Sequence, residues 1–235
     1  PYFARLDANA LIAFAEVATH NHFAFALGGE VFKQTAPVIK LPEEATQNDY
    51  LDLIGVLNSS TVCFWMKQVC HKKGGAPGSG GGDSDQPWSW SYQFNITKIG
   101  DLPIPSALAV GYGRKLGALA IDLQAHTPSS VCQKGVPTRD RLDAARSESI
   151  RIQAEMVATQ EELDWCCYRL YGLANLETSS SAPPPLDLGQ RAFEIALARK
   201  VEAGDEDSVW FEEHRSIAIT KIPDSWTAEY REVVG

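Results

Sequence analysis

The spacing of apolar residues predicts two consecutive helices in the first third of the chain. The segment "TQNDYLDLIGVLN" places three apolar side chains on one helical face: Leu51, Ile54 and Leu57. Thr46 is a suitable N-cap with Asp49 three residues on, which approaches a capping box. Asn58-Ser59-Ser60 then ends this helix and caps a second one over about residues 60–70. Because that second helix is apolar nearly all round, we expect it to be buried.

A longer periodic pattern predicts about 30 residues of helix, in one or two pieces, in the middle of the chain. Apolar and small residues recur alternately every three and four positions, at Leu142, Ala145, Ser149, Ile152, Met156, Thr159, Leu163, Cys166 and Leu170. Thr138 follows Pro137 as an N-cap, and Gly172 is a suitable C-terminal stop. One seam of this helix should therefore pack on a partner element.

Short strands are predicted on both sides of a glycine-rich stretch. Residues 22–41 read as strands with a hairpin signal at Gly28-Gly29. Residues 74–87 contain six glycines and two prolines, which favour no regular element. The following "WSWSYQFNITKI" has strand composition, and residues 106–125 read as a helix. We expect "HTPSSVCQKGVP" to be a loop.

Together these patterns predict an α+β fold: a short-strand mixed sheet with packed helices, a long helix and a helical C-terminal module. We expect an α+β domain over 1–125 and a long helical spacer over 126–176. A Ser/Pro-rich linker at 177–187 and an acidic helical module at 188–235 complete the prediction.

The composition is that of an ordinary globular chain, with 44% hydrophobic and 22% charged residues. No apolar run is long enough to predict a membrane span, and no signal peptide is visible. The start at Pro1, in mid-pattern, suggests a fragment or a processed chain. The five cysteines are odd in number and include no CxxC pair, which favours buried free thiols and a cytoplasmic location.

The net charge of −9 is concentrated in the last third of the sequence. Residues 160–235 carry 15 acids and 7 bases, whereas residues 1–159 carry 15 acids and 14 bases. Within the latter part, residues 110–151 hold 7 bases and 4 acids. One face of the first two-thirds could therefore meet a polyanion, or it could be an ordinary mixed surface.

Catalytic and metal-binding motifs are not evident in the sequence. Cys63, Cys70 and His71 would need a fourth zinc ligand that the spacing does not offer. His20 and His22 would share one side of a strand, but no carboxylate accompanies them in the sequence. The carboxylate pairs at 161–162 and 212–213 are expected on solvated helix faces.

Two segments carry side chains suited to a polyanion. The second predicted helix ends in a cationic group, Lys67, His71, Lys72 and Lys73, where lysines could neutralise phosphates or simply meet the helix dipole. Trp88, Trp90 and Tyr92 alternate along the predicted strand. Their shared face is expected to be part of the core, with base stacking as the alternative.

Five segments resemble, in order, the C-terminal half of large adenine-specific DNA methyltransferases of BREX-type phage defence, which are similar to type IIG restriction–modification enzymes. The segments are "APVIKLPEEATQNDYLDLIGVLNSSTVCFWMKQVCHKKGG", "YQFNITKIGDLPIP", "ATQEELDWCCYRLYGL", "GQRAFEIALARK" and "VWFEEHRSIAITKIPDSW". The resemblance covers nearly the whole chain. "LPIP" alone is weak, and Thr159 departs from the pattern before Gln160.

The resemblance implies a methyl-transfer domain N-terminal to this region, with an S-adenosylmethionine motif and an Asn-Pro-Pro-Tyr-type motif. Neither motif is present here, so the resemblance implies a target-recognition region that grips double-stranded DNA and is itself without catalytic activity. The parent protein would be a site-specific DNA adenine methyltransferase.

Charge and position then suggest which residues meet DNA. Lys67, Lys72 and Lys73 would hold phosphates, and a second phosphate contact is expected at Arg114 and Lys115. Four more side chains are candidates to reach a groove: His71, Gln86, Trp88 and Trp90. The alternative is a protein-interaction module, in which the acidic last third and the long helix dock other subunits of a defence complex.

Overall fold

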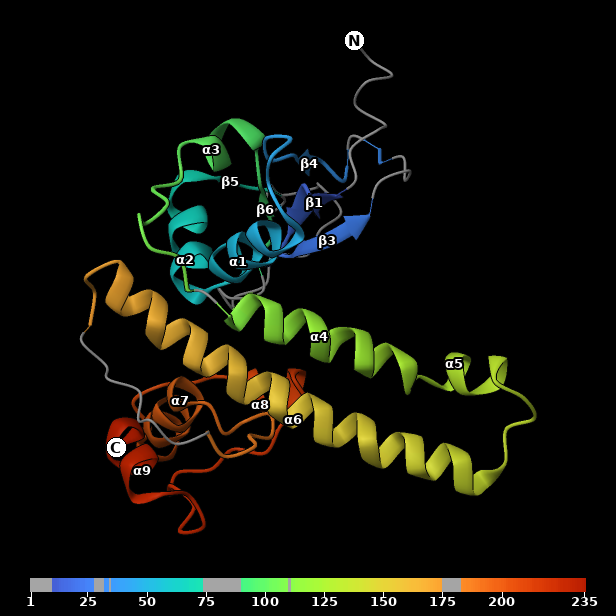
Figure 1. Cartoon of the computed structure of the whole chain (residues 1–235). Coiled ribbons are helices and arrows are strands. Elements are labelled where there is room, and N and C mark those ends of the chain that lie inside the picture. The colour runs from blue at the N-terminus through green and yellow to red at the C-terminus, as the bar shows by residue number, and fades with distance from the viewer. Residues whose placement is uncertain (1–9, 28–31, 34, 74–89, 110, 175–182) are drawn as a thin grey trace, which may run out of the picture. The chain divides into compact units, whose positions relative to one another are not determined.

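The computed structural model describes residues 10–27, 32–33, 35–73, 90–109, 111–174 and 183–235. The chain divides into two compact units, residues 1–114 and residues 115–235 (Figure 1). The first unit holds short strands and helices, and the second unit is helical in the part described. The predicted α+β class is confirmed, including the long helix and the helical C-terminal module.

The first sheet of unit 1 is built around a strand that the sequence pattern did not reveal. β1 (Ala10–Phe14) pairs antiparallel with β3 (Phe23–Leu27) and with β4 (Val38–Ile39), in the order β3-β1-β4. Within residues 22–41, β3 and β4 therefore both pair with β1 and not with each other, and the hairpin predicted at Gly28-Gly29 stays a prediction. Gly28-Gly29 lies outside the described residues.

The two predicted helices of unit 1 begin and end where their caps indicate. α1 (Gln47–Leu57) starts with a capping box between Thr46 and Asp49. α2 (Ser60–Val69) starts at Ser59, whose side chain accepts from the amide of Val62. The side chain of Asn58, between the helices, exchanges hydrogen bonds of 2.9 and 2.8 Å with the backbone of Phe23 and so ties the helix junction to β3.

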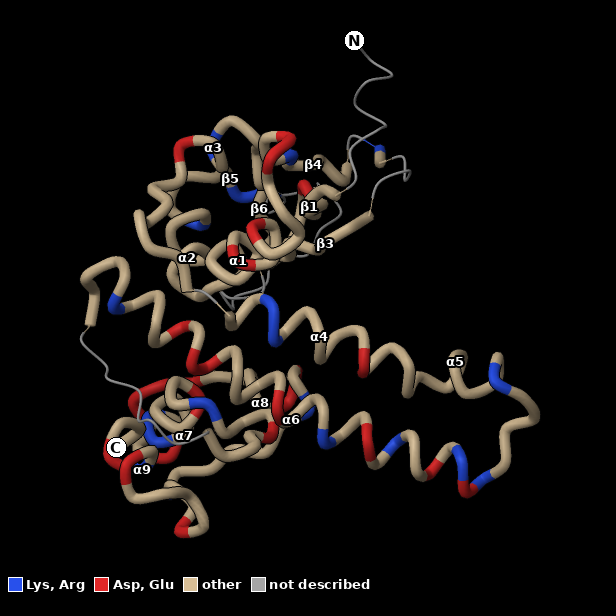
Figure 2. Tube along the Cα trace, viewed as in Figure 1, with Lys and Arg blue, Asp and Glu red and all other residues tan. Residues whose placement is uncertain are grey.

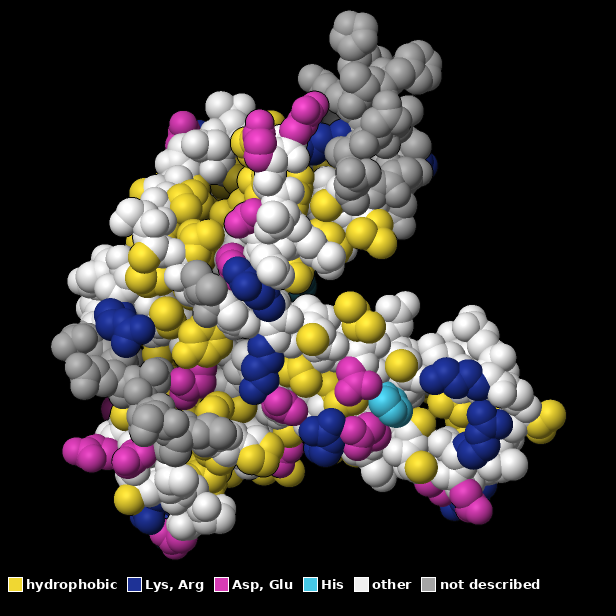
Figure 3. Space-filling model, in the orientation of Figure 1, with side chains coloured by type: hydrophobic (Ala, Val, Ile, Leu, Met, Phe, Trp, Pro, Cys, Tyr) yellow, Lys and Arg dark blue, Asp and Glu magenta, His cyan; other side chains and the backbone are white. Residues whose placement is uncertain are grey.

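α2 is not buried all round, contrary to the prediction. Only Val62 and Met66 are buried, and the Phe64 side chain is 69% exposed. Hydrophobic side chains reach the surface at many points on the face shown in Figure 3. Apolar residues on all faces of a helix therefore do not show that every face is buried, because exposed apolar side chains are common on protein surfaces.

A second small sheet joins three distant parts of unit 1. β2 (Val17–Ala18) and β5 (His71–Lys72) both pair antiparallel with β6 (Tyr92–Gln93). The strand predicted across "WSWSYQFNITKI" stops early, because the Asn95 side chain accepts from the amide of Thr97 at 2.8 Å and caps α3 (Ile96–Gly100). Asn at an N-cap outweighs the strand propensity of the residues that follow.

Unit 2 contains the predicted long helix in one piece. α6 (Arg139–Leu170) starts at Thr138, and Gly172 follows its end with φ +68°. All nine positions of the predicted seam are buried or half-buried. α4 (Tyr112–Ala125) begins in unit 1 and continues into unit 2. The predicted loop after it contains α5 (Pro128–Gln133), which Thr127 caps through the amide of Ser130.

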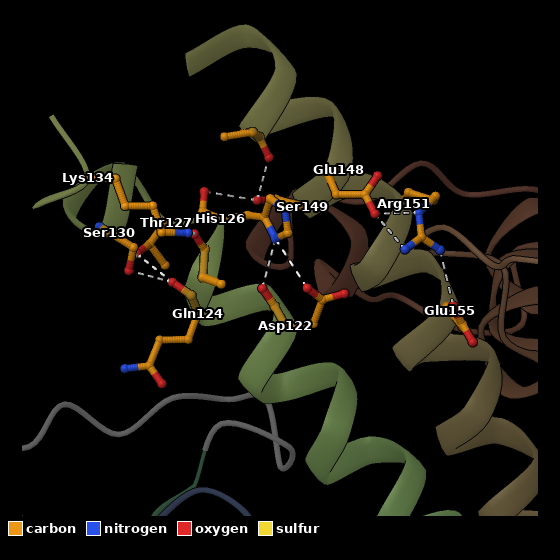
Figure 4. A network of polar contacts seen from close by, with 12 residues as sticks. Asp122, Gln124, His126, Thr127, Ser130, Lys134, Glu148, Ser149, Arg151 and Glu155 are labelled. Carbon is orange, nitrogen blue, oxygen red and sulfur yellow. Dashed lines mark hydrogen bonds and ion pairs between the residues drawn. The ribbon is translucent and has the colours of Figure 1, made fainter. Parts of the chain in front are cut away.

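Polar contacts connect the end of α4 to α6 (Figure 4). The His126 Nδ1 atom lies 2.8 Å from the carbonyl oxygen of Asp122. The Ser149 hydroxyl donates to the carbonyl oxygen of His126 at 3.4 Å, so this serine does not engage the imidazole ring. The serine and histidine are therefore not arranged as a nucleophile and its base. These contacts instead fix the connection between the two helices.

Three short helices complete unit 2: α7 (Ala192–Ala203), α8 (Trp210–Glu213) and α9 (Ala228–Val234). α7 and α9 enclose a core with α6, formed by Ala158, Trp165, Leu186, Ile195, Trp226 and Tyr230. Trp226 and Tyr230 meet edge to face with ring centroids 5.3 Å apart, a favourable arrangement for two aromatic rings.

Carboxylates are buried beside this core, which overturns the predicted solvated face at 161–162. Arg191 reaches the Glu161 carboxylate and the Asp164 carboxylate, each at 2.5 Å. Glu162 is also buried, and burial together with the charge of Glu161 raises its pKa to about 7. The local pattern could not show this, because the compensating guanidinium comes from 30 residues away. The second pair, Glu212 and Glu213, is exposed as predicted.

Candidate nucleic-acid interface

The predicted cationic group lies on and beside the edge strand β5. His71 and Lys72 form that strand and pair with Gln93 and Tyr92, and all three cationic residues from 71 to 73 are exposed. The amide of Lys73 donates to the carbonyl oxygen of Ser91 at 2.7 Å, which extends the pairing by one residue. The pairing therefore holds the backbone of residues 71–73 beside β6 (Figure 2). Of the other predicted residues nearby, Gln86 and Trp88 lie outside the described residues.

Aromatic rings lie under two of these lysines. The Lys72 Nζ atom is 3.4 Å from the ring centroid of Trp90, and the Lys67 Nζ atom is 5.6 Å from that of Tyr92. Tyr92 stacks in turn on the buried Phe94, with an interplanar angle of 6°. The electron-rich ring faces attract both ammonium groups, so the lysine side chains have preferred positions over the sheet.

The lysines of this group form no ion pair within the part of the chain that the structure describes. Lys67, Lys72 and Lys73 contact no carboxylate there, and neither does His71. Glu16, on the neighbouring β2 side, accepts instead from the side-chain amide of Gln93 at 2.8 Å. Asp83 and Asp85, the acidic residues that follow in the sequence, lie outside the described residues. We call Lys67, His71, Lys72, Lys73 and Trp90 the β5 cationic surface.

The two other predicted phosphate ligands are each engaged by a carboxylate. The Arg114 guanidinium holds both oxygens of the buried Asp52, one through Nε at 2.9 Å. The amide of Gly111 adds a 3.3 Å hydrogen bond to the same carboxylate. In unit 2, Lys115 pairs with Glu155 at 3.1 Å. Asp52 was missed in the sequence because one acidic residue near an apolar helix face is not by itself a signal of burial.

A metal site and a membrane span each place requirements on the described residues. The five cysteines are free, with Cys132 exposed and Cys63 half-buried, so the prediction of buried thiols holds only for the other three. No cluster of three or more potential ligands (His, Cys, Asp or Glu) occurs in the ranges given above. Within those ranges, no helix has the length and apolar character needed to cross a bilayer.

This chain is similar to a known protein over most of its length and to a protein family over its C-terminal part. It is 45% identical over 229 residues, or 94% of its length, to "Adenine-specific methyltransferase PglX" of Streptomyces coelicolor, and it spans 19% of that relative's length. Residues 156–235 match a family described as a domain of unknown function (DUF7008). No solved structure matches the chain. The resemblance drawn from the sequence motifs is thereby confirmed: over nearly its whole length, this chain is similar to a segment of an adenine-specific methyltransferase.

Proposed function

We propose that this chain is a DNA-binding target-recognition region of an adenine-specific DNA methyltransferase in phage defence or restriction–modification. The observation that carries the proposal is the β5 cationic surface: Lys72 lies on a paired strand, with Lys73 and Lys67 beside it, and none of the three has a carboxylate partner among the described residues. Because the relative is an adenine-specific methyltransferase, duplex DNA is the anion that best explains such a surface.

The chemistry of adenine methylation requires a surface of this kind. The exocyclic amine of adenine is inaccessible in a stacked duplex, so the base must leave the helix before it can react. A protein that opens DNA in this way has to hold the backbone on either side of the opened base pair. Lysines supply that hold without reading sequence, and neighbouring side chains can then contact base edges.

Each member of the surface has a role that follows from its position. Lys72 and Lys73 project from an exposed strand and would neutralise phosphates, with Lys67 beside them at the end of α2. Trp90 lies under Lys72 and would either stack on an exposed base or hold the lysine toward the backbone. His71, Gln86 and Trp88 remain predicted groove contacts. Arg114 and Lys115 remain predicted phosphate contacts, although each would first have to leave its carboxylate.

Methyl transfer itself would be carried out by another part of the parent protein. This chain contains no Asn-Pro-Pro-Tyr-type motif, and its one multi-proline run, residues 183–185, follows an alanine. S-adenosylmethionine would therefore bind outside this region. The parent protein would act on DNA in the bacterial cytoplasm, beside other subunits of the defence system.

The experiment replaces Lys72 and Lys73 by Glu and measures duplex affinity as a function of salt concentration. The three lysines of the β5 cationic surface should contribute about −3 to the slope of log affinity against log salt, and loss of two of them should make the slope shallower by about 2. The matched control is the Lys200→Glu/Lys221→Glu variant, which changes the net charge equally at two exposed positions of unit 2. That control should keep the wild-type slope.

An unchanged slope in the Lys72→Glu/Lys73→Glu variant would remove the β5 cationic surface from the interface. Equal losses in the two variants would mean that only the overall charge matters. Circular dichroism of both proteins shows whether the fold survives, which is expected because all four lysines are exposed.

A further inference from the structure

A group of stacked aromatic rings lies at the surface of unit 2, far in the sequence from the β5 cationic surface. The rings of Phe193 and Trp210 meet edge to face with centroids 5.5 Å apart, and Trp210 stacks on His214 at 3.8 Å. The Phe193 side chain is 45% exposed, and His214 is exposed as well. We call these three residues the aromatic platform.

The platform is held in place by the Glu194 carboxylate. Trp210 donates its indole N–H to Oε1 of Glu194 at 3.1 Å, while the amides of Gly189 and Arg191 donate to Oε2 at 2.8 and 3.1 Å. Glu194 is buried, so its charge needs all these donors. The half-buried Trp210 ring is therefore held in place by this carboxylate, and the more exposed rings of Phe193 and His214 pack against it.

Further apolar side chains are exposed on the segments that meet at Glu194. Gly189 has φ +95°, and a Cβ there would overlap the carbonyl oxygen of Ile217, so the two backbones touch. The neighbouring Leu188 is 56% exposed and Ile217 is 78% exposed, and Val209 precedes Trp210. Apolar residues so exposed and so close together are typical of a surface that a partner covers.

Free carboxylates border the aromatic platform. From Glu202 to Glu213 the chain carries six acids and no base, and all six are exposed: Glu202, Asp205, Glu206, Asp207, Glu212 and Glu213. None of the six forms an ion pair within the described parts of the chain. We call residues 202–213 the acidic segment. Its uncompensated charge repels nucleic acid and attracts a cationic partner.

We propose that the aromatic platform and the acidic segment form a docking site for a basic, amphipathic segment of another protein. Apolar side chains of the partner would cover Phe193 and its neighbours, and arginines or lysines would pair with the acidic segment. The ring of Phe193 already accepts a guanidinium, since the Cζ atom of Arg191 lies 5.1 Å from its centroid. A helix with one apolar and one basic face combines both features.

The proposal is tested with the full chain and two fluorescein-labelled peptides. One is an amphipathic helix of leucine, alanine and arginine, and the other has every arginine replaced by glutamine. We expect the chain to bind the arginine peptide at least about tenfold more tightly in fluorescence anisotropy, with affinity falling as salt rises. Binding of neither peptide, or equal binding of both, overturns the proposal.

Two variants locate the site, and one serves as the matched control. Glu212→Lys/Glu213→Lys and Phe193→Ser should each weaken binding of the arginine peptide by about tenfold. Glu43→Lys/Glu44→Lys makes the same charge change at two exposed residues of unit 1 and should leave binding unchanged. Equal weakening by the control would make the binding a net-charge effect and overturn the proposal.

A second copy of the chain is the alternative occupant of the platform, and sedimentation velocity distinguishes it. Self-association of the wild-type chain that Phe193→Ser abolishes would assign the platform to a second copy and overturn the proposal. A monomeric wild-type chain that binds the arginine peptide supports it. Because the DNA measurements concern unit 1, failure of either proposal leaves the other standing.

Discussion

At the scale of single residues, Glu162 makes the stability of unit 2 depend on pH. Its ordinary pKa of 4.5 is raised to about 7 by burial and by the charge of Glu161, while Lys115 acts in the opposite direction. Between these two values the folded state keeps a proton that the unfolded state has released. The free energy of unfolding therefore falls as pH rises from about 4.5 to about 7, and this cost remains above pH 7.

Replacing Glu162 by Gln should remove that cost. We expect the variant to exceed the wild type in free energy of unfolding by up to about 3 kcal/mol at pH 8, and to match it closely at pH 4.5. Urea unfolding at both pH values measures the difference. Glu213→Gln is the control, because Glu213 is exposed and should give no such pH dependence. A difference of the same size at both pH values would show that packing, rather than ionisation, is responsible.

Residue-scale contacts are also where the sequence was least informative. Glu161 and Asp164 sit in a helical pattern that is typical of a solvated face, yet Arg191 makes their burial tolerable from a distant part of the chain. The same holds for Asp52, whose partner Arg114 follows 62 residues later. A buried charge is tolerated only beside a compensating charge. When that charge comes from a distant part of the sequence, the local pattern of apolar and polar residues does not reveal it.

At the scale of elements, local signals predicted the helices well. The caps at Thr46, Ser59 and Thr138 are hydrogen bonds that each side chain accepts from the amide three residues on. Because both partners are close in the sequence, local sequence is enough to predict where these helices begin. Strand pairing is harder to predict for the opposite reason: β3 pairs with β1, whose apolar run carries no alternation. The position of Lys72 over Trp90 likewise depends on a pairing that no local pattern specifies.

The contact between α4 and α1 supplies a prediction at this scale. A Cβ added at Gly113, in the first turn of α4, would overlap the backbone carbonyl of Leu51 in α1. Gly113→Ala must therefore push the two helices apart beside the Asp52–Arg114 pair, which should lower the free energy of unfolding by about 1–3 kcal/mol. Thermal unfolding measures the loss. Gly100→Ala is the control, because no atom lies near the Cβ that it would add.

At the scale of the whole molecule, charge is divided between regions with different proposed partners. Residues 1–125 carry 11 acids and 9 bases, whereas residues 138–235 carry 19 acids and 11 bases. The β5 cationic surface belongs to the first piece, and the acidic segment belongs to the second. Along the exposed part of α6, basic and acidic residues alternate, so that helix adds little net charge of either sign (Figure 2).

Separate expression of residues 1–125 and 138–235 tests this division. A break after residue 125 keeps α4 attached to α1 through Arg114 and Gly113, and the second piece retains the core between α6 and α9. In gel shifts at low salt, we expect 1–125 to retain duplex binding within about tenfold of the full chain, and 138–235 to show none. Circular dichroism establishes that each piece is helical before its binding is compared. Duplex binding by 138–235 alone would place the DNA surface in the helical region and leave the lysines of β5 without their proposed role.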